Sequence, residues 1–267
     1  MLPTARGQFG FATNADGITV DLVAYSGPGG DVIIPRTNGD GLPVTGIDGA
    51  FAFRMNVTNV TIPDGVEMIG FDSFLECFNL ASVIIPKSVT NIAEQAFFDC
   101  SLTNVTIPSG VVSIGKEAFE GCQYLTTLEI SGSVSNIGPI AFGNCPLTSI
   151  FFGGNAPNSI ENFWEGKPTI YYFPGTTGWS NSFDGLTALL WNPALQTADA
   201  GFGLRSNQFG FNITGTSNIP IVLEACTNLA IPIWIPLQVL NLTNGLFYFS
   251  EPFQPNNSER FYRISLP

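Results

Sequence analysis

The chain has 267 residues, of which 45% are hydrophobic and only 11% are charged, and its formal net charge is −12 at pH 7. Proteins that bind nucleic acid or anionic membranes present basic surfaces, so this charge balance disfavours both partners. The sequence contains no histidine, which excludes every His-based catalytic triad, metal site and pH switch.

The sequence predicts no transmembrane segment, because no stretch approaches the ~20 apolar residues that a spanning helix needs. Residues 1–7 also lack the apolar core of a secretory signal. Low charge combined with abundant Gly, Pro, Ser, Thr and Asn is typical of secreted β-rich proteins. The protein is therefore either cytosolic or a mature extracellular chain whose signal peptide has been removed, and the composition favours the second.

The first predicted element is a hairpin over residues 8–24. Two alternating segments, Gln8 to Thr13 and Ile18 to Ala24, flank the turn sequence Asn14-Ala15-Asp16-Gly17. The end of a stack of strands needs protection against further pairing. We assign residues 1–30 to an N-terminal capping hairpin.

Residues 31–153 carry an internal repeat of about 23 residues, with four full units and a partial unit at each end. Phenylalanines recur in steps of 23, 23, 22 and 23, and cysteines follow the last three of these steps. A fixed period of this length indicates a solenoid built from stacked coils. The structural core is predicted to contain both columns: Phe51, Phe74, Phe97, Phe119 and Phe142, with Cys77, Cys100, Cys122 and Cys145.

One repeat unit shows how its residues would fold. Residues 60–62 alternate apolar, polar, apolar, which predicts a short strand with one buried face, and Pro63 ends its ladder. A second extended piece ends at Ile69, and Gly70 permits the turn that follows. The residues around Phe74 are expected to form one irregular helical turn that places the ring in the core. A single unit buries too little to be stable, so the units must stack.

The cysteine column allows three interpretations. In-register stacking would bring neighbouring cysteines within disulfide range, but their side chains point the same way, so a bond would be strained. A metal ladder lacks the paired close spacing of zinc sites. We favour four small buried hydrophobic residues, and we expect Cys226, which lies outside the array, to be a core residue as well.

The repeat L-x-x-V-x-I-P-x-x-V-x-x-I-G-x-x-A-F-x-x-C resembles the BspA-like leucine-rich repeat family over about residues 30–153. The resemblance implies a right-handed solenoid of the kind found on bacterial surface or secreted proteins, where it serves adhesion and protein contacts. Two positions depart from the pattern: Ser131 replaces the proline of the fourth unit, and Ser73 replaces the alanine of the first.

The middle residue of each repeat strand should face away from the core, because side chains alternate along a strand. Either a partner or the capping segments cover these residues, or they show the ordinary scatter of apolar residues on a surface. We take them as the candidate interaction face and name them the outward column: Ile33, Thr61, Ile84, Thr106, Glu129 and Phe151.

Carboxylates gather on the turns around the phenylalanine and cysteine positions. Calcium binding is one interpretation, but no D-x-D-x-D-G loop is present, and a solvated acidic face is favoured. No carboxylate pair, G-x-S-x-G motif or phosphate-binding glycine loop marks an active site. We therefore predict no enzyme activity, no catalytic or metal-binding residue and no cofactor.

Residues 154–192 are predicted to cap the other end of the solenoid, with a strand at residues 170–173 and bulk from Trp164, Trp179 and Trp191. Regular patterning is lost at residues 192–202, which we interpret as a linker. Residues 203–267 then alternate in short segments, which predicts a small antiparallel β-sandwich. Residues 258–264 resemble the last strand of small C-terminal β domains of secreted bacterial proteins, which implies an accessory surface module.

The tetrapeptide Gln-Phe-Gly-Phe occurs at residues 8–11 and again at residues 208–211. Chance or shared β-sheet chemistry is one explanation. The other is that both copies are edge strands that pair between molecules and build an open filament. The candidate assembly residues are Phe9, Phe11, Phe209 and Phe211.

These patterns favour a mainly β, non-enzymatic protein of the bacterial cell surface that presents a repeat surface for adhesion or self-assembly. Its partner would be another protein or copies of itself, in a homo-oligomer or filament. The alternative is a carbohydrate-binding surface module in which Trp179, Tyr171 or Tyr172 stacks on sugars.

Overall fold

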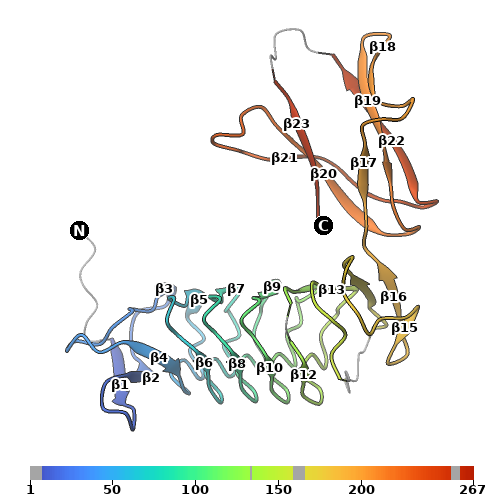
Figure 1. The fold of residues 1–267 in the computed structure, drawn as a ribbon. Coiled ribbons are helices and arrows are strands. Elements are labelled where there is room, and N and C mark those ends of the chain that lie inside the picture. Colours follow the sequence, from blue (N-terminus) through green and yellow to red (C-terminus); the bar gives the residue numbers. More distant parts are fainter. Residues whose placement is uncertain (1–7, 133, 159–165, 254–258) are drawn as a thin grey trace. The chain divides into compact units, whose positions relative to one another are not determined.

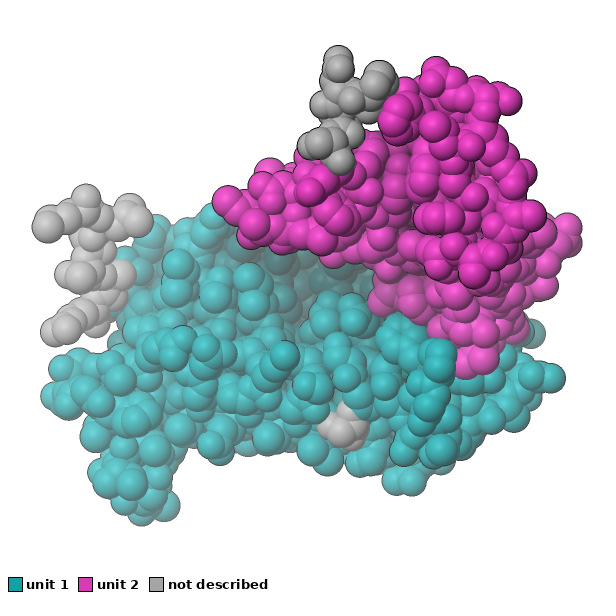
Figure 2. All heavy atoms as spheres, turned by 45° about the horizontal axis from the view of Figure 1, so that its top comes forward, with its two compact units in different colours: residues 1–188 teal, residues 189–267 magenta. Residues whose placement is uncertain are grey.

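The computed structural model describes residues 8–132, 134–158, 166–253 and 259–267. Every regular element in these ranges is a β-strand (Figure 1). The chain divides into two compact units, residues 1–188 and residues 189–267, which Figure 2 shows in different colours.

The first unit is a β-solenoid in which each coil contributes one strand to each of two parallel ladders. One ladder is a seven-stranded sheet in chain order. Its strands are β1 (Phe9–Thr13), β2 (Val20–Tyr25), β4 (Val44–Ile47), β6 (Met68–Ile69), β8 (Asn91–Ile92), β10 (Ser113–Ile114) and β12 (Asn136–Ile137). The pairings from β2 to β12 are parallel, and β1 and β2 form an antiparallel hairpin at the N-terminal end.

The second ladder carries the outward column and consists of two sheets. The first contains β3 (Gly30–Ile33), β5 (Val57–Thr61) and β7 (Ser82–Ile84). The second contains, in spatial order, β9 (Asn104–Ile107), β11 (Thr127–Ile130), β13 (Ser149–Phe152), β14 (Thr169–Tyr172), β16 (Leu186–Leu190) and β15 (Ser182–Phe183). The pairing is interrupted between β7 and β9, where the turn at residues 100–102 is one residue shorter than the turn of the preceding coil. The same shortening at residues 145–147 leaves the pairing of β11 with β13 intact, so turn length alone does not cause the break.

The turns that carry the phenylalanines form a third ladder of backbone hydrogen bonds. Phe74 N donates to Ala96 O, Phe97 N to Ala118 O and Phe119 N to Ala141 O, at 2.7–2.8 Å. Asp72 and Glu76, two residues before and after Phe74, both have positive φ, at 54° and 53°. The predicted helical turn is therefore wrong, because left-handed residues on both sides of the ring cannot continue a right-handed helix.

The buried phenylalanines stack face to face through the solenoid. Ring centroids of Phe51, Phe74, Phe97, Phe119 and Phe142 are 4.9–5.3 Å apart in sequence order, with interplanar angles of 1–11°. The capping hairpin extends the stack, since Tyr25 lies 4.9 Å from Phe51 and Phe9 lies 5.2 Å from Tyr25. The cap thus supplies its own aromatic rings in the place of a further coil.

The cysteines form a second buried column beside the rings. Each thiol donates a hydrogen bond to the carbonyl oxygen of a phenylalanine in the preceding coil, as in Cys77 Sγ to Phe51 O (3.0 Å) and Cys100 Sγ to Phe74 O (3.1 Å). All five cysteines are buried thiols. Burial raises the pKa of Cys100 and of Cys122 well above the usual thiol value, so both stay protonated and able to donate.

Ser73 shows how the first unit tolerates a departure from the repeat. Its side chain is fully buried at the position that Ala96, Ala118 and Ala141 occupy in later units. Its hydroxyl donates to Ile47 O (2.9 Å) and lies 2.8 Å from Gly70 O. The buried oxygen is therefore satisfied, which removes the penalty of burying a hydroxyl.

Aromatic side chains pack together near the C-terminal end of the first unit. Trp179 stacks on Tyr172 at 5.5 Å and contacts Phe152 and Phe183, and its indole N–H donates to Gly154 O (3.1 Å). Trp164, which we predicted to add bulk here, lies outside the described residues. Tyr172 and Trp179 are therefore packing residues of this end of the unit.

The second unit consists of two antiparallel sheets, as predicted. One contains β17 (Ala194–Gln196), β18 (Gly203–Arg205), β19 (Gln208–Thr214) and β22 (Leu246–Pro252), and the other contains β20 (Pro220–Cys226), β21 (Ile235–Asn241) and β23 (Phe261–Ser265). Tyr262 of β23 contacts Phe209, Phe211 and Phe249 of the opposite sheet at 5.0–6.0 Å between ring centroids. The linker expected at residues 192–202 is wrong in part, because β17 pairs with β19 inside this unit. Ser258, in the segment matched to a C-terminal strand, lies outside the described residues.

Candidate functional site

The register of the second ladder aligns the outward column. Ile33, Thr61 and Ile84 are direct neighbours in β3, β5 and β7. Thr106, Glu129 and Phe151 are direct neighbours in β9, β11 and β13. The alternation that points these residues outward buries the residues beside them, such as Val60 and Val105.

Aliphatic exposure in the column is concentrated at its N-terminal part. Ile33 is 75% exposed and Ile84 is 60% exposed, while Thr61 between them is half-buried. Thr106 is exposed and Glu129 is half-buried, with Thr106 Oγ1 donating to Glu129 Oε2 at 3.5 Å. The first three positions therefore present two isoleucines on a three-stranded parallel sheet.

Phe151 is expected to be exposed to solvent like the rest of the outward column, and this is wrong, because its side chain is fully buried. Its ring stacks on Tyr171 of the next strand, with centroids 4.9 Å apart and an interplanar angle of 19°. Strand alternation determines from which face of the sheet a side chain projects. It does not determine which other residues cover that face. The candidate interaction face is therefore reduced to the five residues from Ile33 to Glu129.

A polar column runs beside the outward column. Asn59, Ser82 and Asn104 are exposed, and Asn59 Nδ2 donates to Asp31 Oδ1 at 2.6 Å in the neighbouring strand. Amides and hydroxyls dominate here, and Asp31 adds one carboxylate. The face thus combines exposed isoleucine with uncharged hydrogen-bonding groups and little charge.

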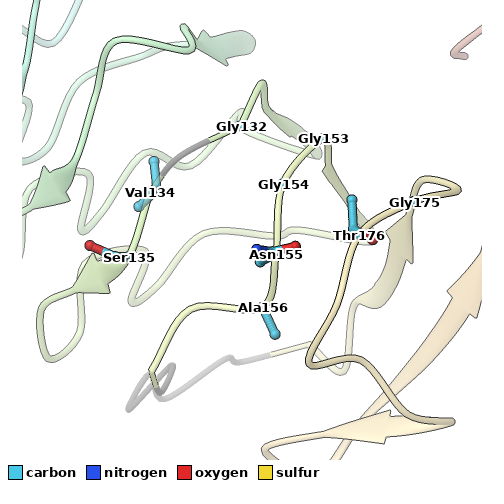
Figure 3. A pocket seen from close by; sticks show the side chains of 9 residues that line it. All are labelled: Gly132, Val134, Ser135, Gly153, Gly154, Asn155, Ala156, Gly175 and Thr176. Carbon is cyan, nitrogen blue, oxygen red and sulfur yellow. The ribbon is translucent and has the colours of Figure 1, made fainter.

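A cleft of about 490 Å³ lies near the C-terminal end of the first unit (Figure 3). Gly132, Gly153, Gly154 and Gly175 supply much of its wall, and a Cβ at Gly154 would lie 1.8 Å from Gly132 O. Its polar side chains, Ser135, Asn155 and Thr176, carry no charge and already bond to backbone: Ser135 Oγ to Val112 O, Asn155 Oδ1 from Thr177 N, and Thr176 Oγ1 to Phe173 O. The lining residues offer no general acid, base or nucleophile in an activated setting.

A second cleft, of about 270 Å³, lies in the second unit and is lined mainly by aromatic rings. Arg260 Nη2 donates to Glu251 Oε2 (2.8 Å), and the Tyr262 hydroxyl donates to Glu251 Oε1 (2.5 Å). Because β22 and β23 belong to different sheets, this network ties the two sheets together at the cleft. Burial raises the pKa of Tyr262, so its hydroxyl remains a donor.

Sequence reasoning missed this network. Glu251 lies 9 and 11 residues before Arg260 and Tyr262, on a strand of the other sheet, and no motif connects them. Charged residues are rare in the strands of the second unit. An ionisable residue at a position that faces the interior of the unit needs a partner, and this requirement could have indicated the network.

The structure also describes the residues of the sugar-binding and metal-binding interpretations. The proposed sugar platforms are packed, since Tyr171 is buried and Tyr172 and Trp179 lie against the core of the first unit. Among the described residues, no group of three acidic or cysteine side chains is arranged to hold a metal ion. Burial raises the pKa of the Asp72, Asp99 and Glu120 carboxyl groups on the turns.

The two Gln-Phe-Gly-Phe segments occupy different positions. β1 is the terminal strand of the seven-stranded sheet, whereas β19 pairs with β17 and β18 along one edge and with β22 along the other. Phe211 is buried and Phe209 stacks on Tyr262. The idea of two equivalent edge strands is therefore wrong, because the backbone groups of β19 are already paired.

Comparison with protein families matches residues 47–167 to the BspA type leucine rich repeat region, in 6 copies. Residues 47–167 are BspA-type leucine-rich repeats. The resemblance stated from the repeat residues is thereby confirmed, including the fold that it implies. In the part of the chain that the structure describes, no helix has the length and apolar character to cross a membrane.

Three solved structures are similar to this chain. A T. pallidum leucine rich repeat protein is 24% identical, with a TM-score of 0.54 over 64% of this chain and 86% of that one. A leucine rich cell surface protein from Faecalibacterium prausnitzii is 22% identical, with a TM-score of 0.39 over 64% and 70% of the two chains. The pneumococcal vaccine antigen PcpA is 17% identical, with a TM-score of 0.49 over 68% and 48%. The first likeness shows the fold alone, and no curated protein matches the chain.

Proposed function

We propose that this protein is a non-enzymatic bacterial protein of the cell surface or extracellular space, whose BspA-type repeats present the outward column for adhesion to another protein. The observation that carries the proposal is the pair of exposed isoleucines, Ile33 and Ile84, on the second ladder beside exposed Asn59, Ser82 and Asn104. Folding gains little from these isoleucines, because most of their surface lies in solvent. Contact with a partner would bury them, and the neighbouring amides and hydroxyls supply hydrogen bonds that fix its orientation.

The test measures binding of the full chain to a panel of purified extracellular proteins by biolayer interferometry. The double variant Ile33→Ser/Ile84→Ser is expected to weaken binding by about tenfold or more, because burying one isoleucine contributes roughly 1.5–3 kcal/mol. The matched control is Val112→Ser, which removes an exposed aliphatic side chain beside β10 on the other ladder. Equal binding by both variants and the wild type contradicts the proposal.

Self-assembly is the second form of this proposal, with another copy as the partner. It is supported by β1, which is the terminal strand of its sheet and pairs with β2 on one side. An edge strand of this kind can accept a strand from a neighbouring molecule. Electron microscopy and sedimentation velocity across a range of concentrations test it, and monodisperse monomers at every concentration would remove it.

A further inference from the structure

The connection between β20 and β21 in the second unit is the most apolar exposed segment of the described chain. In residues 227–236, nine of the ten residues are exposed and Trp234 is half-buried. An extended segment lying flat on a protein surface would bury about every second side chain. Exposure on both sides shows that the connection, residues 227–234, extends away from the strands that it joins, as Figure 1 also shows. We name residues 227–236, the connection and the first two residues of β21, the apolar tip.

The exposed side chains of the tip are large and aliphatic. Leu229, Ile231, Ile233 and Ile235 are 53–74% exposed, and Val239 of β21 follows at 67%. Soluble proteins rarely present so many adjacent aliphatic side chains to water without a function for them. Asn228 Oδ1 accepts a hydrogen bond from Ala230 N (2.8 Å), so a local turn helps to shape the tip.

The surroundings of the tip are uncharged, although the chain has a net charge of −12. Residues 225–250 contain no Asp, Glu, Lys or Arg. The nearest cation, Arg263, lies 4.4 Å above the Trp234 ring and pairs with Glu224 at 2.6 Å. A surface without net charge fits a neutral partner and has nothing to attract an anionic one.

Backbone chemistry narrows the choice of partner. Pro232 and Pro236 have no N–H group, so a strand added along the tip would lack two backbone donors there. The same absence reduces the number of polar groups that lose water when the tip leaves the aqueous phase.

We propose that the apolar tip inserts into the interface of an electrically neutral lipid bilayer and so attaches the second unit to a membrane surface. The aliphatic side chains enter the boundary between headgroups and acyl chains, and Trp234 lies at headgroup depth, where indole rings are favoured. The stacked and paired Arg263 stays in water beside Glu224. This attachment is independent of the adhesion proposed for the first unit.

The experiment is co-sedimentation of the full chain with phosphatidylcholine vesicles. Wild type is expected to bind with little dependence on salt, and Ile231→Ser/Ile233→Ser is expected to lower the partition constant by about tenfold or more. A blue shift of tryptophan emission on adding vesicles should disappear in Trp234→Phe. Because these side chains are exposed, the serine variant should fold normally, as circular dichroism will check.

The matched control is Ile18→Ser/Val112→Ser, which removes two exposed aliphatic side chains from the first unit outside the outward column and should bind vesicles as the wild type does. The proposal is overturned if wild type does not sediment with the vesicles, or if the tip variant binds equally well. It is also overturned if binding requires phosphatidylglycerol and is lost at high salt. Concentration-dependent self-association that the tip variant abolishes, without vesicle binding, would identify a second copy as the occupant instead.

Discussion

The two units of this protein place their large apolar side chains differently. In the first unit the phenylalanines repeat, lie fully inside and stack at about 5 Å, whereas in the second unit a row of isoleucines and a leucine extends into solvent. A coil inside a solenoid has a neighbour on both sides, so each added ring finds two partners. A small sandwich has one interior, and apolar residues outside it contribute little to folding. Exposed apolar residues of the second unit are therefore better evidence of binding than buried ones of the first.

The largest effect should come from opening the phenylalanine stack. Phe97→Ala removes a fully buried ring between Phe74 and Phe119, and such truncations destabilise by about 3–5 kcal/mol. Calorimetry should show a loss in the unfolding transition of the first unit, with that of the second unchanged. Phe78→Ala is the control, since Phe78 is exposed; equal effects of the two substitutions would show that stacking is not what stabilises the coils.

The next effect should lie in the second unit, where one carboxylate connects the two sheets. Glu251→Gln weakens its bonds with Arg260 and Tyr262, and we expect a loss of about 2 kcal/mol because charge-assisted hydrogen bonds contribute roughly 1.5–3 kcal/mol. Urea unfolding followed by tryptophan fluorescence measures it.

The exposed pair of Arg36 and Asp64 provides the comparison for Glu251. Its atoms are 3.0 Å apart, but both side chains are largely in water. Asp64→Asn should therefore cost less than about 0.5 kcal/mol. If it costs as much as Glu251→Gln, partial burial is not what strengthens the network of the second unit.

A smaller effect is expected in the cysteine column. Cys100→Ala removes the thiol bond to Phe74 O, while that carbonyl keeps its bond from Cys77 N (3.3 Å). We expect a loss of about 1–2 kcal/mol, confined to the first unit, from the small cavity and the lost bond. Cys226→Ala should instead weaken the second unit. A thiol reagent that labels folded Cys100 as fast as unfolded chain would contradict the burial of this column.

The smallest effect concerns pH. Burial, with Glu94 and Asp48 nearby, raises the pKa of Asp72, and among the described residues its Oδ1 is a buried oxygen without a hydrogen bond. A raised carboxyl pKa means that ionised Asp72 destabilises the folded state above that pKa, and the penalty fades as pH falls toward the ordinary value of 3.8. Asp72→Asn should raise the melting temperature slightly at neutral pH, with a gain below about 1 kcal/mol that vanishes in acid. A gain that persists in acid would instead point to relief of backbone strain at its positive φ.

Much of the first unit could be predicted from its sequence. The 23-residue period, the alternation in residues 60–62 and the prolines that end most of the repeat strands determine stacked coils, because each is a local property repeated in register. The second unit's antiparallel strands followed from alternation in the same way. These signals do not depend on what lies next to the strands in space.

Tertiary structure alone decided which outward residues meet solvent. Ile33 and Phe151 have the same place in the repeat, yet one is exposed and the other is buried against Tyr171. The identical Gln-Phe-Gly-Phe segments became an end strand and a fully paired strand, and Glu251 found partners that no motif connects to it. Alternation fixes the direction of a side chain. Its burial depends on residues from other strands, and only the whole fold determines which of these residues lie next to it.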